Sequence, residues 1–156
     1  MRAPSIHAAI AAAALLSSFH PADAGSRGSA AEGVATAFYK NAFTYTGRTV
    51  DETLLKARPL FVDQSAFESF SRAVRESGNY EAAKKYDMTV TASPGKASSS
   101  KGDDGSWKIV FQSLDAYRPA RGVGIEMCVE VETILRPAGD GLKIASVVQS
   151  DCRSEK

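Results

Sequence analysis

The sequence has few residues that can carry acid–base or metal chemistry. It contains only two histidines, His7 and His20, and both lie in an N-terminal segment that we expect to be removed. Without them the chain has no Ser–His or Cys–His pair for nucleophilic catalysis and no imidazole ligand for a metal ion. Its two cysteines, Cys128 and Cys152, form no C-x-x-C motif. We therefore expect no metal, no cofactor and no catalytic residues.

An excess of charge of one sign is also absent. The chain has 19 Lys and Arg against 18 Asp and Glu, a formal net charge of +1, and no basic tract. Binding to nucleic acid or to a membrane surface requires a concentrated basic surface, so neither partner is expected. A length of 156 residues with 44% hydrophobic and 24% charged residues is typical of one globular domain.

The first 24 residues differ from the rest. Arg2 provides a positive start, residues 6–19 form an apolar run, and Ala22–Ala24 provide an A-x-A cleavage site. A membrane anchor is the alternative, but it needs about 20 unbroken apolar residues, and this run is shorter. We predict a cleavable signal peptide over residues 1–24. The mature protein is then periplasmic, or secreted further, and has no membrane anchor.

Two helices are predicted at the start of the mature chain. Residues 25–30 are rich in glycine and serine and are predicted to be a flexible tether. The first helix covers residues 31–45, where apolar side chains recur at spacings of three and four. A short second helix follows a capping box of Thr49 and Glu52. It ends before Pro59, because proline disfavours helical geometry in the preceding residue.

The third helix has the clearest boundaries. Asp63 is a candidate N-cap and Gly78 a candidate C-terminal cap. Between them Phe67, Phe70 and Val74 recur at helical spacing. We expect this helix to bury an aromatic stripe.

From Tyr86 onward the apolar period changes to two, which predicts four strands. They cover residues 86–92, 107–117, 125–136 and 142–150. The Ser- and Gly-rich stretch between the first two strands, up to Gly105, is predicted to be a mobile loop. Helices followed by antiparallel strands indicate a single α+β domain over residues 31–152, with three helices packed on one face of a curved four-stranded sheet, and a short tail over residues 153–156.

A disulfide between Cys128 and Cys152 is plausible in an oxidising compartment. If residues 139–141 form a three-residue hairpin loop, Ala138 faces Leu142 and Cys128 lies opposite Cys152. A two-residue turn or a bulge would shift this pairing by one residue. The compartment and the register together favour the bond.

The order of helices and strands resembles the cone-shaped fold of nuclear transport factor two, the cystatin-like cone that ketosteroid isomerases also have. Short hydrophobic motifs further resemble the periplasmic domain of the DotI/IcmL proteins. They extend from about Val34 to Gln149 and comprise Phe38–Tyr45, Pro59–Phe61, Phe67–Phe70, Ser77–Ala83, Trp107, Tyr117, Arg136–Pro137 and Gly141–Ala145.

The resemblance implies a component of a type IVB secretion or conjugation system, related to the conjugation protein TraM. Such proteins act by self-association and by contacts with other subunits, not by catalysis. This chain departs from the family in its cleavable signal, where DotI proteins keep a transmembrane helix, and in its cysteine pair. We therefore expect an accessory or structural protein with protein partners, either subunits of such a system or further copies of itself.

A non-catalytic protein-interaction module is the first of two functional hypotheses. Curved sheets bind partners through aromatic anchors or by adding a strand. The candidate contact residues are Tyr80, Tyr86, Tyr117 and Arg118. Tyr86 and Tyr117 also suit a position in the core or at its rim.

The alternative is an exported small-ligand-binding protein or an isomerase-like enzyme that uses the cavity of the cone. Such chemistry needs a carboxylate in an apolar pocket beside a tyrosine. Glu126, Glu130 and Glu132 share one strand face, which is also the pattern of a solvated face. A buried glutamate beside a tyrosine hydroxyl would favour the enzyme, whereas three exposed glutamates would exclude it.

Overall fold

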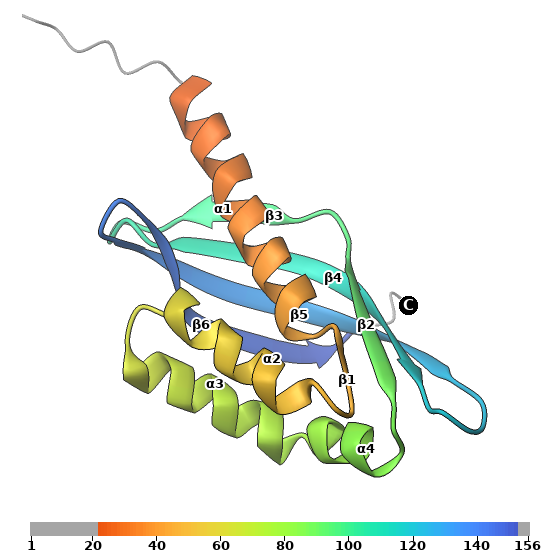
Figure 1. The fold of residues 1–156 in the computed structure, drawn as a ribbon. Helices are drawn as coiled ribbons and strands as arrows, with labels where there is room; N and C mark the ends of the chain where they lie inside the picture. Colours follow the sequence, from red (N-terminus) through yellow and green to blue (C-terminus); the bar gives the residue numbers. More distant parts are fainter. Residues whose placement is uncertain (1–21, 153–156) are drawn as a thin grey trace, which may run out of the picture.

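The structure is a computed structural model and describes residues 22–152. In this part of the chain, helices lie on one side of a curved antiparallel sheet (Figure 1). The elements are α1 (Ala22–Ala42), β1 (Tyr45–Thr46), α2 (Val50–Ala57), a 3-10 turn (Arg58–Leu60), α3 (Gln64–Glu76), α4 (Asn79–Lys85), β2 (Thr89–Pro94), β3 (Ser98–Lys101), β4 (Trp107–Arg118), β5 (Ile125–Ala138) and β6 (Gly141–Asp151).

The predicted α+β class is confirmed, but the predicted counts were wrong. Between residues 22 and 152 there are four α-helices and six strands, where three and four were expected. Most of the predicted signal peptide, residues 1–21, and the tail at 153–156 lie outside the described residues. None of the helices in the described range combines the length and apolarity that a membrane span requires.

Helix α1 begins well before its predicted start, so the predicted tether at residues 25–30 was wrong: these residues are helical. Close packing explains the difference. A Cβ on Gly28 would lie 3.0 Å from the Ser99 hydroxyl and 3.6 Å from the Trp107 ring. The Ser99 hydroxyl also donates to the Glu32 carboxylate at 2.7 Å. These contacts with β3 and β4 offset the low helix propensity of glycine and serine.

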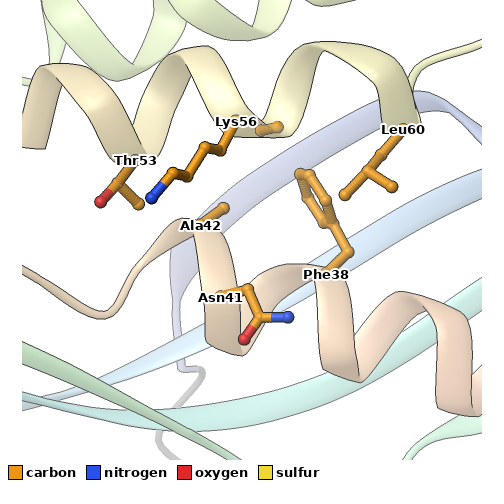
Figure 2. Close-up of a pocket in the computed structure, with 7 residues that line it drawn as sticks. Phe38, Asn41, Ala42, Thr53, Lys56 and Leu60 are labelled. Carbon is orange, nitrogen blue, oxygen red and sulfur yellow. The ribbon is translucent and has the colours of Figure 1, made fainter.

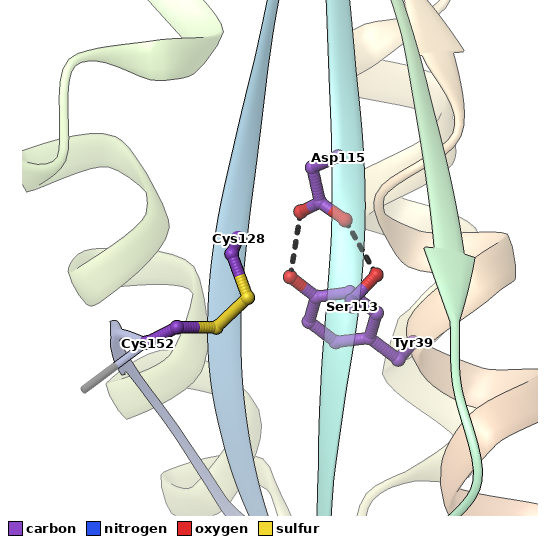
Figure 3. Close-up of a disulfide and its surroundings, with 5 residues drawn as sticks. All are labelled: Tyr39, Ser113, Asp115, Cys128 and Cys152. Atoms are coloured by element: carbon purple, nitrogen blue, oxygen red, sulfur yellow. Dashed lines mark hydrogen bonds between the residues drawn. A yellow bond between two sulfur atoms is a disulfide. The ribbon is translucent and has the colours of Figure 1, made fainter. Parts of the chain in front are cut away.

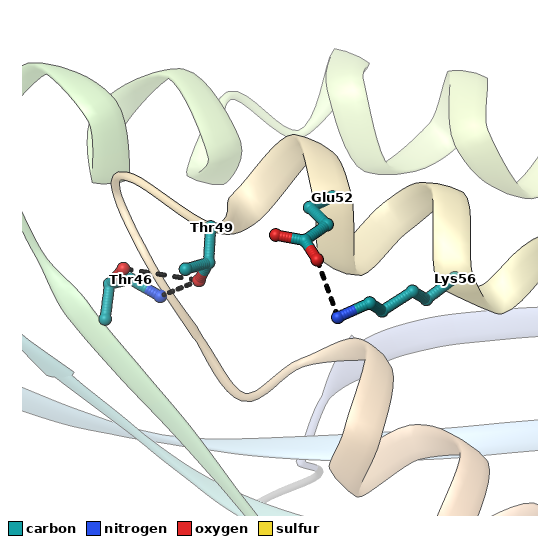
Figure 4. A network of polar contacts seen from close by, with 4 residues as sticks. All are labelled: Thr46, Thr49, Glu52 and Lys56. Atoms are coloured by element: carbon teal, nitrogen blue, oxygen red, sulfur yellow. Dashed lines mark hydrogen bonds and ion pairs between the residues drawn. The ribbon is translucent and has the colours of Figure 1, made fainter.

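The capping box predicted for α2 is absent. Thr49 has helical backbone angles (φ −103°, ψ −3°) and makes no side-chain cap, whereas a capping residue needs extended geometry to reach the helix N–H groups. Its hydroxyl instead accepts from the Thr46 N–H at 3.0 Å, and Glu52 pairs with Lys56 at 2.7 Å (Figure 4). The predicted end before Pro59 is confirmed.

Both predicted caps of α3 are present. Asp63 Oδ1 accepts from the Ala66 N–H at 2.8 Å, and Gly78 has a left-handed backbone (φ +76°) just after the helix. Helix α4, which follows Gly78 directly and ends at Lys85, was not predicted. The next strand, β2, therefore begins at Thr89 instead of Tyr86.

The sheet has the strand order β1-β2-β4-β5-β6, and β3 also pairs with β4. Strand β3 lies in the stretch predicted to be a mobile loop, where Ser98–Lys101 pair with Trp107–Val110. This segment has no alternating apolar residues, so its strand character comes from pairing with β4 and contact with α1.

The turn between β5 and β6 has two residues, so the three-residue loop was wrong. Ala138 pairs with Gly141, and Gly139 takes the positive φ (+63°) of the first turn position. A bulge between Ile134 and Leu135 then shifts the register back by one residue. The two shifts cancel.

As a result, Cys128 and Cys152 still lie opposite each other. The Cys152 N–H donates to the Cys128 carbonyl at 3.3 Å. In the structure the two cysteines form a disulfide with a Cα–Cα distance of 5.4 Å.

Aromatic rings fill the space between α1, α3 and the 3-10 turn. We call this group the aromatic cluster: Phe38, Phe43, Phe61, Phe67 and Phe70. The ring centroid of Phe61 lies 5.1 Å from that of Phe70 and 5.6 Å from that of Phe67. Most contacts are edge-to-face, which is a favoured arrangement of aromatic pairs.

Candidate functional site

A set of hydrogen-bonded polar side chains lies beneath α1, on the sheet face that carries the core. We call it the polar network: Tyr39, Ser113, Asp115 and Gln149. The Tyr39 hydroxyl donates to Asp115 Oδ2 at 2.8 Å, and the Ser113 hydroxyl donates to Asp115 Oδ1 at 2.5 Å (Figure 3). Gln149 Nε2 donates to the Tyr39 hydroxyl at 2.7 Å. The network therefore joins α1 to β4 and β6.

The period of the strand and the packing of α1 place these side chains. Ser113 and Asp115 follow Phe111 at alternate positions of β4, so all three face the helices. Tyr39 lies above them, stacked on Phe43 at 4.4 Å and edge-on to Phe111 at 5.5 Å. The aromatic contacts fix the position of the Tyr39 ring and hence of its hydroxyl.

Burial dominates the electrostatics of the network. It raises the pKa of Asp115, with hydrogen bonds from Ser113 and Tyr39 acting in the opposite direction. Burial, together with the adjacent Asp115, also raises the pKa of Tyr39, so this hydroxyl keeps its proton and remains a donor. Nearby, burial raises the pKa of Tyr117 to about 12.

This arrangement suits a structural clamp better than a catalytic base. Asp115 is 1% exposed, and each of its carboxylate oxygens accepts a hydrogen bond from the protein. A general base must reach the proton that it removes. A substrate would have to displace Tyr39 or Ser113 to reach Asp115.

The three glutamates proposed for the alternative function are not buried. They lie on the sheet face that points away from the helices, which we call the outer face. Glu126 pairs with Arg118 at 3.8 Å, Glu132 pairs with Lys108 at 2.7 Å, and Glu130 is partly exposed. None lies beside a tyrosine hydroxyl, so the glutamate version of the enzyme hypothesis was wrong.

The carboxylate that is buried, Asp115, was not among the predicted site residues. A signal for it was present, because Asp115 occupies an inward position of a strand whose other inward residues include Ile109 and Phe111. A charged residue at such a position is buried and needs partners. The partner on α1, Tyr39, is far away in the sequence and could not be assigned from spacing.

The structure separates the four predicted contact residues into two groups. Tyr80 and Tyr117 are buried, and the Tyr80 hydroxyl donates to the Ala42 carbonyl at 3.2 Å. Tyr86 is exposed, with Lys85 Nζ 5.2 Å from its ring centroid. Arg118 is also exposed. Only these last two are available to a partner.

The exposed pair lies near an apolar surface at the end of the β4–β5 hairpin. We call it the hairpin end: Tyr86, Val123, Ile125 and Met127. Tyr86 lies there because its carbonyl accepts from the Ala120 N–H of the connecting loop at 3.4 Å. Val123 is 90% exposed in the connecting loop. Ile125 and Met127 point to the same sheet face as the core but are exposed there. Large exposed apolar groups of this kind mark protein–protein contact sites.

A cleft of about 410 Å³ lies between α1 and α2 (Figure 2). Its lining includes Phe38, Ala42 and Ala57, which are buried, with Lys56 at the polar end. Lys56 is already paired with Glu52, so the cleft offers no free charge to a ligand. No group of three potential metal ligands is found among residues 22–152.

No family model and no curated protein matches the sequence. Solved structures do match the fold. An IcmL-like type IV secretion system protein from Legionella pneumophila has a TM-score of 0.73 at 13% identity, over 82% of this chain and 95% of that one. The periplasmic domain of DotI gives 0.71 at 20% identity, over 80% and 95%. A periplasmic fragment of TraM gives 0.63 at 19% identity, over 78% and 96%.

The resemblance to DotI/IcmL proteins that the sequence motifs predicted is therefore confirmed at the level of the fold. Each of these solved domains is matched over almost its whole length. At such low identity the similarity describes the fold and not the activity.

Proposed function

We propose that this chain is a non-catalytic periplasmic protein-interaction module, accessory or structural to a type IVB secretion or conjugation system. The main support for the proposal is the similarity of the fold to an IcmL-like protein, to DotI and to TraM. These neighbours are a type IV secretion system protein and two periplasmic domains or fragments. Three neighbours of this kind favour a role in the same kind of system, and not only the same fold.

The polar network supports a role without catalysis. Its carboxylate, the candidate for acid–base chemistry, is occupied by Tyr39 and Ser113. The raised pKa of Tyr39 keeps that hydroxyl a donor and not a base. Such a network positions α1 on the sheet and leaves binding to the surface.

The hairpin end is the surface that we assign to a protein partner. It presents Tyr86, Val123, Ile125 and Met127 to solvent, whereas Arg118 pairs with Glu126 on the outer face. Aromatic residues such as Tyr86 are enriched among the side chains that dominate binding energy. A subunit of the secretion or conjugation apparatus would cover this apolar surface.

Recovery of partners from the native cell envelope tests the proposal. Tagged protein is isolated after mild cross-linking, and the co-purifying proteins are identified by mass spectrometry. We expect subunits of a secretion or conjugation apparatus, and we expect their yield to fall in a Val123→Glu variant. Val148→Glu is the matched control, because Val148 is also exposed (58%) but lies on β6, away from the hairpin end.

A preparation free of partners would overturn the proposal and favour the alternative, a small-ligand-binding protein. One observation favours that alternative: a buried carboxylate beside a tyrosine hydroxyl, Asp115 and Tyr39. Equal recovery from Val123→Glu and the wild type would keep the secretion role but remove the hairpin end as the contact.

The periplasmic location has its own test. Cleavage at the predicted site leaves Gly25 as the first residue, inside α1. N-terminal sequencing of the protein from the periplasmic fraction should therefore begin at Gly25. Protein that keeps residues 1–24 would contradict the predicted signal peptide.

A further inference from the structure

We propose that the Cys128–Cys152 disulfide is an exchangeable latch: a dithiol reductant opens it, and its opening loosens α1 through Gln149 and Tyr39. This inference does not depend on a secretion role. It combines the exposure of the bond, the weak attachment of the end of β6, and the hydrogen bonds that connect that end to α1.

The bond lies where a reductant can reach it. Cys128 is exposed and Cys152 partly exposed, both on the outer face of the sheet. The residue opposite Cys128 on β4 is Leu114, itself 48% exposed. The helices pack on the other face (Figure 1). Thiol–disulfide exchange requires a thiolate to reach one of the two sulfur atoms, so access favours reaction here.

The end of β6 has few other attachments. Ile144 belongs to the buried core and Val147 is partly buried against it, but the side chains from Val148 to Asp151 are exposed. Within residues 22–152, the interactions that hold the strand beyond Val147 are its ladder to β5, the disulfide and the hydrogen bond of Gln149. Strand ends with exposed side chains and little apolar contact open readily.

Gln149 connects this strand end to the interior. Its amide donates to the Tyr39 hydroxyl at 2.7 Å, and that hydroxyl donates to Asp115 at 2.8 Å. Tyr39 lies in α1 and is fully buried. When the end of β6 opens, Tyr39 loses the donor from Gln149, and α1 loses its hydrogen-bonded connection to β6.

The chemistry is an ordinary exchange with a dithiol. One thiolate of the reductant attacks a cysteine sulfur, breaks the S–S bond and forms a mixed disulfide. The second thiol of the reductant then displaces this cysteine. Both cysteines leave as thiols after taking up two protons, and the reductant leaves as its disulfide, having supplied two electrons.

Hydrogen exchange of the purified oxidised protein, with and without dithiothreitol under native conditions, tests the latch. We expect both thiols to become titratable without denaturant. Amide exchange should then accelerate about tenfold or more over residues 148–152, as in a locally opened segment, and measurably over residues 36–42 of α1. A Cys128→Ser/Cys152→Ser double variant should show the same exchange pattern without reductant.

A matched pair of variants separates the latch from general loosening. In Gln149→Leu, reduction should still loosen residues 148–152 but should no longer affect α1. In Ser150→Ala, which alters an exposed side chain one residue further along β6, reduction should affect both segments. Thiols that appear only after unfolding in urea would overturn the proposal. An amide exchange rate in α1 that does not change when the wild type is reduced would also overturn it. So would a change in α1 that is equally large in Gln149→Leu.

Discussion

The interior of this domain has two halves that meet at adjacent residues of α1. Phe38 belongs to the aromatic cluster, and Tyr39 belongs to the polar network. The aromatic cluster is held by ring contacts with α3 and with Phe61, just after the 3-10 turn. The polar network is held by three directed hydrogen bonds, two of which join α1 to β4 and β6. Apolar burial is non-directional, and hydrogen bonds depend on geometry.

The two halves make different contributions to the fold. The aromatic cluster contributes more stabilisation than the polar network, because it removes large apolar surfaces from water. The polar network contributes less net free energy, but an unpaired member would be costly to bury. It therefore fixes where α1 lies on the sheet. Variants in the two halves should consequently differ in the size of their effects.

The largest effect is expected from Phe70→Ala in the aromatic cluster. Phe70 is buried and contacts the rings of Phe38, Phe43 and Phe61. Its removal leaves a cavity and should lower the free energy of unfolding by about 3–5 kcal/mol. Chemical denaturation monitored by circular dichroism measures this. Leu55→Ala, at a 62% exposed apolar position of α2, is the control and should change the stability little.

A smaller loss is expected from Tyr39→Phe in the polar network. The ring contacts with Phe43 and Phe111 remain, but Asp115 loses one donor and Gln149 loses its acceptor. We expect the free energy of unfolding to fall by about 1–3 kcal/mol. Tyr86→Phe, at an exposed position, should be neutral. Equal effects of the two variants would mean that the network does not position α1.

Local patterns in the sequence predicted the half that depends on burial alone. The stripe of Phe67, Phe70 and Val74 and the alternation in β4 and β5 follow from period, and all three stripe residues are buried. The caps of α3 were predictable because they are local. The disulfide partners lay opposite each other only because the two-residue turn and the bulge shift the register in opposite directions.

Contacts between distant segments determine what sequence patterns missed. Residues 25–30 are helical because Gly28 packs on β3 and β4, and β3 is a strand because it pairs with β4. The polar network joins Tyr39 to Asp115 and Gln149. Asp115 lies in a strand whose extent was predicted, but its partner Tyr39 comes from an element far away in the sequence.

A gain in stability is expected at a third position, Thr133 on β5. Its side chain is fully buried, and its hydroxyl has no hydrogen-bond partner among the described residues. Thr133→Val removes this buried polar atom and keeps the shape. We expect the free energy of unfolding to rise by about 1 kcal/mol. A loss of stability would indicate an internal water bound to the hydroxyl. Thr91→Val, at an exposed position of β2, is the control.

The smallest and most specific effect is the pH dependence due to Asp115. Burial raises the pKa of this carboxyl above its value in the unfolded chain, which is about 3.9. Between these two pKa values the folded state binds more protons than the unfolded state, so the stability contributed by Asp115 falls as the pH rises through this window. Acidification from neutral pH towards about pH 4 should therefore stabilise the wild type relative to Asp115→Asn, which cannot titrate.

The quantity to measure is the difference in free energy of unfolding between these two proteins, and how it changes with pH. The asparagine also alters hydrogen bonds, but it does so at every pH, so only the slope of this difference reports the titration of Asp115. Exposed acids shift the other way: Lys56 lowers the pKa of Glu52. Since Glu52 is present in both proteins, its contribution cancels in the difference. A difference that stays constant between about pH 4 and 8 would mean that Ser113 and Tyr39 stabilise the carboxylate fully, with no net cost of burial. A slope of the expected sign would mean that burial outweighs those two hydrogen bonds, and that the polar network is kept for the position it gives α1.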